Sequence, residues 1–190
     1  MAIRRSSPIW TVLVLPVIAS LIFVVSDSSF AQERKKIAPW LSKGDNTKIS
    51  GQQAFQIPNM DGHVMRIAEF RRTWPDGGGP VIEGQKVAEE ITHGFVDLIA
   101  GNGHGFGYST WRFDNGDLMF GEFQNAIQTV VNSDRTRKTT FVGTYVTTGG
   151  TGRLKGIKGL GRFSGTAELD AEGKTTRNEV NGGGEYWFEK

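Results

Sequence analysis

The stretch TTGGTGRLKGIKGLGRFSGT, from Thr147 to Thr166, places seven glycines in twenty residues, interleaved with four basic side chains. A Walker phosphate loop requires a Gly-Lys pair followed by Ser or Thr and then a helix, and this stretch contains no such pair. A dinucleotide fingerprint requires a βαβ unit around the glycines, and no following helix is visible. The glycines therefore favour a backbone role in a β-fold over nucleotide binding.

The second half of this stretch alternates with a period of two, which is typical of a strand that has one buried face. One face consists of small and apolar residues and is predicted to point inward: Gly159, Gly161, Phe163, Gly165, Ala167 and Leu169. The opposite face is polar: Arg162, Ser164, Thr166, Glu168 and Asp170. Because small barrels crowd their interior where the strands bend, inward glycines favour a barrel.

Turn signals such as Asp61-Gly62 and Asn115-Gly116 recur along the rest of the chain and separate β-branched and aromatic segments. They predict eight strands, near residues 51–58, 63–73, 84–99, 104–114, 117–131, 138–148, 158–170 and 175–189. Residues 84–99 also match helical spacing at several apolar positions, but Gly94 and the β-branched residues favour a strand. Eight antiparallel strands in meander order can close into an up-and-down β-barrel without exposed edges.

The N-terminus predicts export. Arg4 and Arg5 precede an apolar run from residue 9 to 25, and Ser29 and Ala31 form a small-residue site for cleavage before Gln32. A retained membrane anchor is the alternative, because the apolar run just reaches the length of a span. Cleavage divides the chain into a signal peptide (1–31), an N-terminal arm (32–50), in which Trp40 and Leu41 contact the domain, and a β-barrel domain (51–190). The mature protein is then secreted or periplasmic and has no stable membrane span.

Composition excludes several classes of protein. The formal charge of +2 falls to +1 without residues 1–31, which carry two arginines and one aspartate, so nothing indicates nucleic-acid binding. The chain has no Cys, which excludes disulfides and thiol catalysis. The three histidines, His63, His93 and His104, form no close ligand pair, so no metal site is predicted.

The segment FVGTYVTTGGTGRLKGIKGLGRFSGTAEL, from Phe141 to Leu169, resembles the strand, GGTG turn and returning strand of the allene oxide cyclase and dirigent superfamily. Leu154 stands where that motif usually has Phe. The matching turn glycines are structural: Gly149, Gly150, Gly152, Gly156 and Gly159. The resemblance implies a calycin-like eight-stranded antiparallel barrel with an apolar cavity, often dimeric or trimeric. Plant members cyclise an unstable oxylipin or guide the coupling of phenoxy radicals, without a metal or organic cofactor.

No catalytic residue of that family is matched by position, so candidate site residues come from alternation alone. Tyr108 and Arg112 share one face of a predicted strand, and Phe120 and Glu122 share one face of the next. If this face lines a cavity, these four side chains would bind a ligand, orient its polar head or act in acid/base chemistry. The alternative is a charge pair and its neighbours on the outer face.

Three hypotheses for function follow. The leading hypothesis is an exported barrel that binds a small apolar or amphipathic ligand. The second is a cofactor-free isomerase or cyclase, which requires a carboxylate inside the barrel, with four candidates: Glu122, Glu168, Glu179 and Glu185. The third is a structural or oligomeric interaction module with a packed interior. The sequence leaves open whether the protein is an enzyme.

Overall fold

The structure is a computed structural model that describes residues 32–58, 60–75, 77–172 and 175–189. The predicted signal peptide, residues 1–31, lies outside the described residues. The described chain is all-β, with two 3₁₀ turns, η1 (Gly44–Asn46) and η2 (Gly152–Leu154). Its strands are β1 (Lys35–Lys43), β2 (Thr47–Gln56), β3 (His63–Thr73), β4 (Val81–Ile82), β5 (Gln85–Ile99), β6 (Asn102–Phe113), β7 (Leu118–Val131), β8 (Arg137–Gly150), β9 (Ile157–Leu169) and β10 (Thr175–Phe188). A membrane-crossing helix is absent from this part of the chain.

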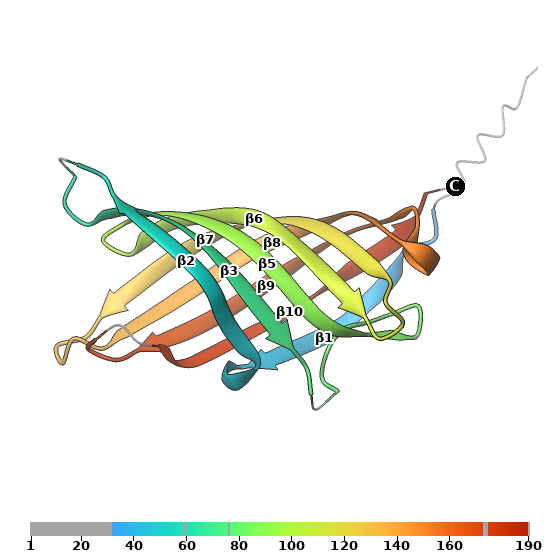
Figure 1. The fold of residues 1–190 in the computed structure, drawn as a ribbon, viewed down its shortest axis with the longest axis horizontal. Helices are drawn as coiled ribbons and strands as arrows, with labels where there is room; N and C mark the ends of the chain where they lie inside the picture. The colour runs from blue at the N-terminus through green and yellow to red at the C-terminus, as the bar shows by residue number, and fades with distance from the viewer. Residues whose placement is uncertain (1–31, 59, 76, 173–174, 190) are drawn as a thin grey trace, which may run out of the picture. The chain divides into compact units, whose positions relative to one another are not determined.

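The strands form one antiparallel sheet in the order β1-β10-β9-β8-β7-β6-β5-β3-β2, with the short β4 paired to β5 (Figure 1). From β5 to β10 every strand pairs with its neighbours in the chain, as in an up-and-down meander. The predicted all-β class and antiparallel meander are therefore confirmed. Residues 85–99 form strand β5, so the strand interpretation of that segment was correct and the helical alternative was wrong.

The sheet differs from the predicted closed barrel at its edges. Residues 35–43, expected in an arm outside the barrel, form β1 and pair with β10 from Lys35↔Tyr186 to Lys43↔Glu179. Trp40 is buried there as predicted, whereas Leu41 is exposed. Among the described residues no ladder joins β1 to β2, so closure into an eight-stranded barrel is not confirmed.

β1 and β2 nevertheless follow each other directly through η1. Eight successive antiparallel pairings separate them across the sheet, so both strands run in the same sense. The chain from residue 35 to 56 thus contacts β10 with its first half and β3 with its second half. The backbone of Asn178 in β10 lies against Gly44 of η1, where a methyl group would approach the Asn178 nitrogen to 3.1 Å.

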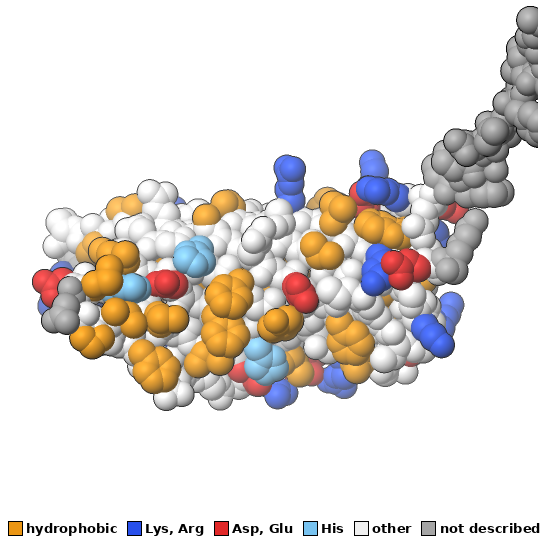
Figure 2. Space-filling view, turned by 90° about the horizontal axis from the view of Figure 1, so that it is seen from above, with side chains coloured by type: hydrophobic (Ala, Val, Ile, Leu, Met, Phe, Trp, Pro, Cys, Tyr) orange, Lys and Arg blue, Asp and Glu red, His pale blue; other side chains and the backbone are white. Residues whose placement is uncertain are grey.

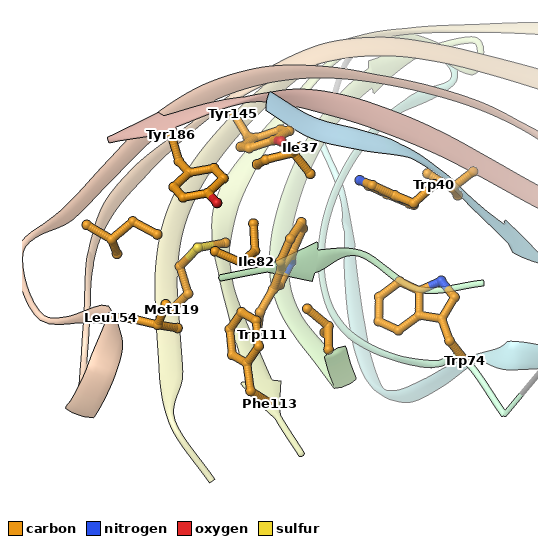
Figure 3. Close-up of a cluster of buried hydrophobic side chains, with 13 residues drawn as sticks. Ile37, Trp40, Trp74, Ile82, Trp111, Phe113, Met119, Tyr145, Leu154 and Tyr186 are labelled. Atoms are coloured by element: carbon orange, nitrogen blue, oxygen red, sulfur yellow. The ribbon is translucent and has the colours of Figure 1, made fainter. Parts of the chain in front are cut away.

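A cluster of buried hydrophobic residues packs where β6 ends and β7 begins (Figure 3). Its centre is Ile82, which is completely buried and belongs to the segment between β3 and β5. Trp40 packs edge-on against both Trp74 and Trp111, with ring centroids 6.0 and 6.1 Å apart. The segment between β3 and β5, which contains Trp74 and the short strand β4, therefore packs with side chains of the long strands in one hydrophobic cluster.

The glycine-rich turn between β8 and β9 is stabilised by Asp117, the residue before β7. The Asp117 carboxylate accepts a hydrogen bond from the Arg153 backbone nitrogen at 3.1 Å. The Thr151 hydroxyl accepts a hydrogen bond from the Leu118 nitrogen at 2.9 Å, and Leu154 is completely buried. Gly152 and Gly156 have φ values of +54° and +80°, in the left-handed region that favours glycine. These contacts give the turn a structural role.

Candidate functional site

A cavity of about 930 Å³ lies on the inner face of the sheet. Its lining comes from β1, β2, β3 and every strand from β5 to β10. Apolar and aromatic side chains make up much of the wall, including Trp40, Phe70, Trp111, Phe123, Phe141 and Phe163. Volumes of ~300 to 1,000 Å³ with mainly apolar walls are typical of sites for small molecules.

Glycines make room for the aromatic side chains of this wall. A methyl group at Gly161 would lie 2.3 Å from Tyr145 Cζ, and one at Gly165 would lie 2.3 Å from Phe141 Cζ. Gly143 likewise lies under the ring of Phe163, at 2.5 Å. Each ring lies over a glycine of an adjacent strand, which flattens it against the sheet and leaves space in the interior. The predicted inward face of β9 is therefore correct: Phe163, Ala167 and Leu169 line the cavity.

An ion pair between Arg72 and Glu90 lies in the wall of this cavity. Arg72 Nη1 donates to Glu90 Oε2, and Arg72 Nε donates to Thr47 Oγ1 at 3.2 Å. The two side chains are only 12% and 10% exposed. Glu90 pairs across the sheet with Trp111 and is the only carboxylate among the described residues that line the cavity.

Tyr145 lines the same cavity and packs against Trp111, with ring centroids 6.2 Å apart. Burial, to which the negative charge of Glu90 adds, raises the pKa of the Tyr145 phenol to about 12. The phenol is therefore neutral at physiological pH. Its oxygen has no hydrogen-bond partner in the described chain, and the same holds for Trp40 Nε1, Asn125 Oδ1 and Asn178 Oδ1 in the same wall. Buried polar atoms without a protein partner are rare in folded proteins, and water or a ligand can satisfy them.

Arg66, on the inner face of β3, is the second ionic feature of the cavity. It is half-buried and forms no ion pair or hydrogen bond with any described residue. Burial alone lowers the pKa of its guanidinium. Arg137 at the start of β8 also lines the cavity but is exposed. Arg66 is thus a partly desolvated cation without a counter-ion among the described residues.

The four candidates from alternation lie on the opposite side of the sheet. Tyr108 and Phe120 are 57% and 37% exposed, and Glu122 is exposed opposite Tyr108 in the β6–β7 ladder. Arg112, whose side chain is about half exposed, forms an ion pair with Glu89 at 2.9 Å. None of the four lines the cavity in the described structure. Apolar side chains are visible on the surface of the molecule (Figure 2). Phe95 and Phe106, which are both exposed, stack with ring centroids 5.2 Å apart.

The candidate glutamates and the histidines named in the sequence analysis do not line the cavity either. Glu179 and Glu185 form ion pairs with Arg177 and Arg34, and Glu168 and Glu122 do not line the cavity. His63 contacts Asp97 at 2.6 Å, and His93 contacts Glu69 at 3.0 Å. Within the described ranges, no three His, Asp or Glu side chains gather in a way that could hold a metal ion.

The fold and the cavity define this chain as an all-β protein whose antiparallel sheet lines a cavity with its inner face. Comparison with known protein families, with functionally described proteins and with solved structures finds no match. The resemblance to the allene oxide cyclase and dirigent superfamily therefore stays a hypothesis based on the Phe141–Leu169 motif.

Sequence reasoning missed Arg66, Arg72 and Glu90. The inward face of β3 contains Arg66, Ala68, Phe70 and Arg72, and its outward face contains Met65, Ile67, Glu69 and Arg71, so hydrophobicity does not distinguish the faces. A usable signal existed in β5, where Glu90, Thr92 and Gly94 pair with Trp111, Ser109 and Gly107 of β6. The inward residues of β6 are small or aromatic, and residues paired across two strands point to the same face. This pairing could have identified Glu90 as a carboxylate that points inward.

Proposed function

We propose that this protein is an exported, secreted or periplasmic, barrel protein that binds one small apolar or amphipathic molecule in its cavity. The observation that carries this proposal is the cavity of about 930 Å³ with an aromatic wall and a few polar groups. The alternative of a purely structural module requires a packed interior, which a cavity of this size does not favour. Homo-oligomerisation stays a separate prediction.

The proposal includes a barrel with eight strands. In this view β1 and β2 are the two halves of the first strand, bent at η1, and β3 and β5 to β10 supply the other seven. The continuous chain from β1 to β2 would join the two edges in place of a ladder. Three features support a relationship to the allene oxide cyclase and dirigent superfamily. They are the observed strand order, the shared direction of β1 and β2, and the GGTG turn.

Binding can be tested by titration with the apolar fluorophore N-phenyl-1-naphthylamine. Thr139 lines the cavity, whereas its neighbour Thr140 is exposed on the outer face. We expect saturable binding by the wild type and by Thr140→Phe, and binding at least tenfold weaker in Thr139→Phe. Ala167→Phe, which fills the cavity from the opposite residue on β9, should weaken binding in the same way.

Circular dichroism would verify that each variant keeps its β-structure. Equal affinity of the Thr139→Phe, Ala167→Phe and Thr140→Phe variants would contradict the proposal, because the fluorophore would then bind outside the cavity. Absence of saturable binding to the wild type would contradict it as well.

Glu90 favours a second candidate function, a cofactor-free isomerase or cyclase. A carboxylate that lies inside a largely apolar cavity can act as a base or stabilise a developing positive charge. This candidate predicts that an unstable allene oxide substrate yields a stereochemically enriched product with the wild type. Glu90→Gln should then abolish the enrichment and leave fluorophore binding intact. A racemic product with the wild type would leave ligand binding as the function.

A further inference from the structure

The charges that face the cavity are strongly unbalanced. Among the described residues, the charged side chains of its lining are four arginines and one glutamate: Arg66, Arg72, Arg137, Arg177 and Glu90, of which Arg137 and Arg177 are exposed. The whole chain carries 22 basic and 20 acidic side chains, so the excess of cations belongs to the cavity and does not reflect general composition. A cavity lined by one sign of charge attracts ligands of the opposite sign.

Two of these arginines already have a carboxylate partner. Arg72 pairs with Glu90, and Arg177 donates to Glu179 at 2.8 Å. Arg66 and Arg137 have no ion-pair partner among the described residues. Arg137 is exposed and can be hydrated, but Arg66 is half-buried, so its charge is only partly solvated. An anionic group of a ligand would compensate this loss of hydration and would accept hydrogen bonds from the guanidinium.

The surroundings of Arg66 fit an apolar chain attached to such an anion. Phe70 lies four residues further along β3, on the same inward face. Phe70 and Phe123 both approach Gly94, each 3.6 Å from the position of a methyl group there. Phe123 in turn packs against Phe163, with centroids 6.0 Å apart. A series of aromatic side chains therefore lies further along the cavity wall, beginning on the strand face that also contains Arg66.

We infer that the ligand is an amphiphile with a single anionic group, and that Arg66 binds this group while the aromatic surface of Phe70, Phe123 and Phe163 contacts its apolar chain. This inference rests on the proposed function, because it assigns the ligand of the same cavity. Arg66 is then the residue that selects a charged ligand over a neutral ligand of equal length. A carboxylate, a sulfonate or a phosphate monoester could provide this anionic group.

The test compares two probes that differ only in charge, 11-(dansylamino)undecanoic acid and its methyl ester. We expect the wild type to bind the acid at least tenfold more tightly than the ester at low ionic strength. Arg66→Gln should remove most of this preference by weakening acid binding tenfold or more, with ester binding changed less than threefold. Arg66→Lys, which keeps the charge, should retain a clear preference for the acid.

Arg162→Gln is the matched control, because Arg162 is an exposed arginine on the outer face of β9 and its loss changes the net charge equally. Equal affinity of the wild type for acid and ester would overturn the inference while leaving cavity binding intact. Equal weakening by Arg66→Gln and Arg162→Gln would also overturn it, because the effect would then be one of net charge. If neither probe binds, the proposed function itself fails. The comparison of the two probes on the wild type decides the inference even where a variant does not fold.

Discussion

The Arg72 guanidinium donates a hydrogen bond to the Glu90 carboxylate inside the cavity, where about nine-tenths of each side chain is removed from solvent. The pair joins β3 to β5, two neighbouring strands of the sheet. A buried pair of this kind need not stabilise a fold compared with apolar residues, yet removal of one partner leaves the other charge uncompensated. Removal of either partner is therefore expected to change both the stability of the sheet and the charge inside the cavity.

Glu90→Gln should lower the free energy of unfolding by about 3 kcal/mol, because Arg72 is left buried without its counter-ion. Urea denaturation followed by tryptophan fluorescence measures this change. Glu89→Gln is the matched control on the next residue. Its partners Arg71 and Arg112 are about half exposed, so we expect a loss below about 1 kcal/mol. Equal losses in the two variants would contradict the buried role of Glu90.

Gly161→Ala should destabilise the protein by about 1 to 3 kcal/mol, because the new methyl group would lie 2.3 Å from the Tyr145 ring. Gly51→Ala, in β2, has no atom within 4 Å of the new methyl group and should change stability little. Thermal unfolding followed by circular dichroism compares the two variants. A Gly161→Ala variant as stable as Gly51→Ala would show that Tyr145 does not lie over Gly161.

Gly152→Ala should lower the free energy of unfolding by about 2 to 3 kcal/mol. Alanine at a φ of +54° is strained, and its methyl group would lie 1.8 Å from Asp117 Oδ1, which would displace the carboxylate that binds the Arg153 nitrogen. Gly149→Ala, in the same motif, meets no atom within 4 Å and serves as control. Chemical denaturation should separate the two variants, and similar midpoints would argue against a structural role for the Asp117 contact.

Tyr145 should make stability depend on pH in the alkaline range. Its pKa of about 12 in the folded protein lies above the value of ~10 in an unfolded chain. Between these values the unfolded chain loses the phenol proton and the folded protein retains it, so rising pH favours unfolding. The stabilisation is complete below about pH 10 and is lost as pH approaches 12, with a total of about 2 to 3 kcal/mol.

Urea denaturation at several pH values from 9 to 12 would measure this dependence, with Tyr145→Phe as the comparison. As pH rises, the free energy of unfolding should decrease less in Tyr145→Phe than in the wild type, by about 2 to 3 kcal/mol. In a titration followed by tyrosinate absorbance, Tyr145→Phe should lack one of the phenols that ionise at high pH. Identical pH profiles of the two proteins would contradict the burial of Tyr145. Tyr186, whose pKa burial also raises, contributes equally to both profiles.

Much of the fold follows from local patterns. The predicted strand near residues 63–73 matches β3, and the segments near 117–131 and 158–170 match β7 and β9 within one residue at each end. These strands could be predicted because turn residues interrupt the chain regularly and the β-branched and aromatic segments have few helical alternatives. β1 was missed because it has Pro39 in its middle and pairs only with β10, more than 130 residues further along the chain.

The candidate site could not be predicted in the same way. Tyr108 and Trp111 both look suitable for a cavity in sequence, yet only Trp111 points inward, because the direction of a strand's two faces depends on how the whole sheet curves. Arg66 and Glu90 are ordinary charged residues in sequence, and their roles arise from strands that lie next to each other only after folding.

By itself the sequence determined the β-class, the antiparallel meander and the glycine-rich turn from residue 149 to 159, since these depend on backbone preferences and alternation over a few residues. The tertiary structure decided which face lines the cavity, that Glu90 meets Arg72 there and that Arg66 meets no carboxylate of the described residues. The physical reason is that burial and charge pairing are properties of contacts between distant strands, whereas period-two alternation defines two faces and does not say which of them the curved sheet will enclose.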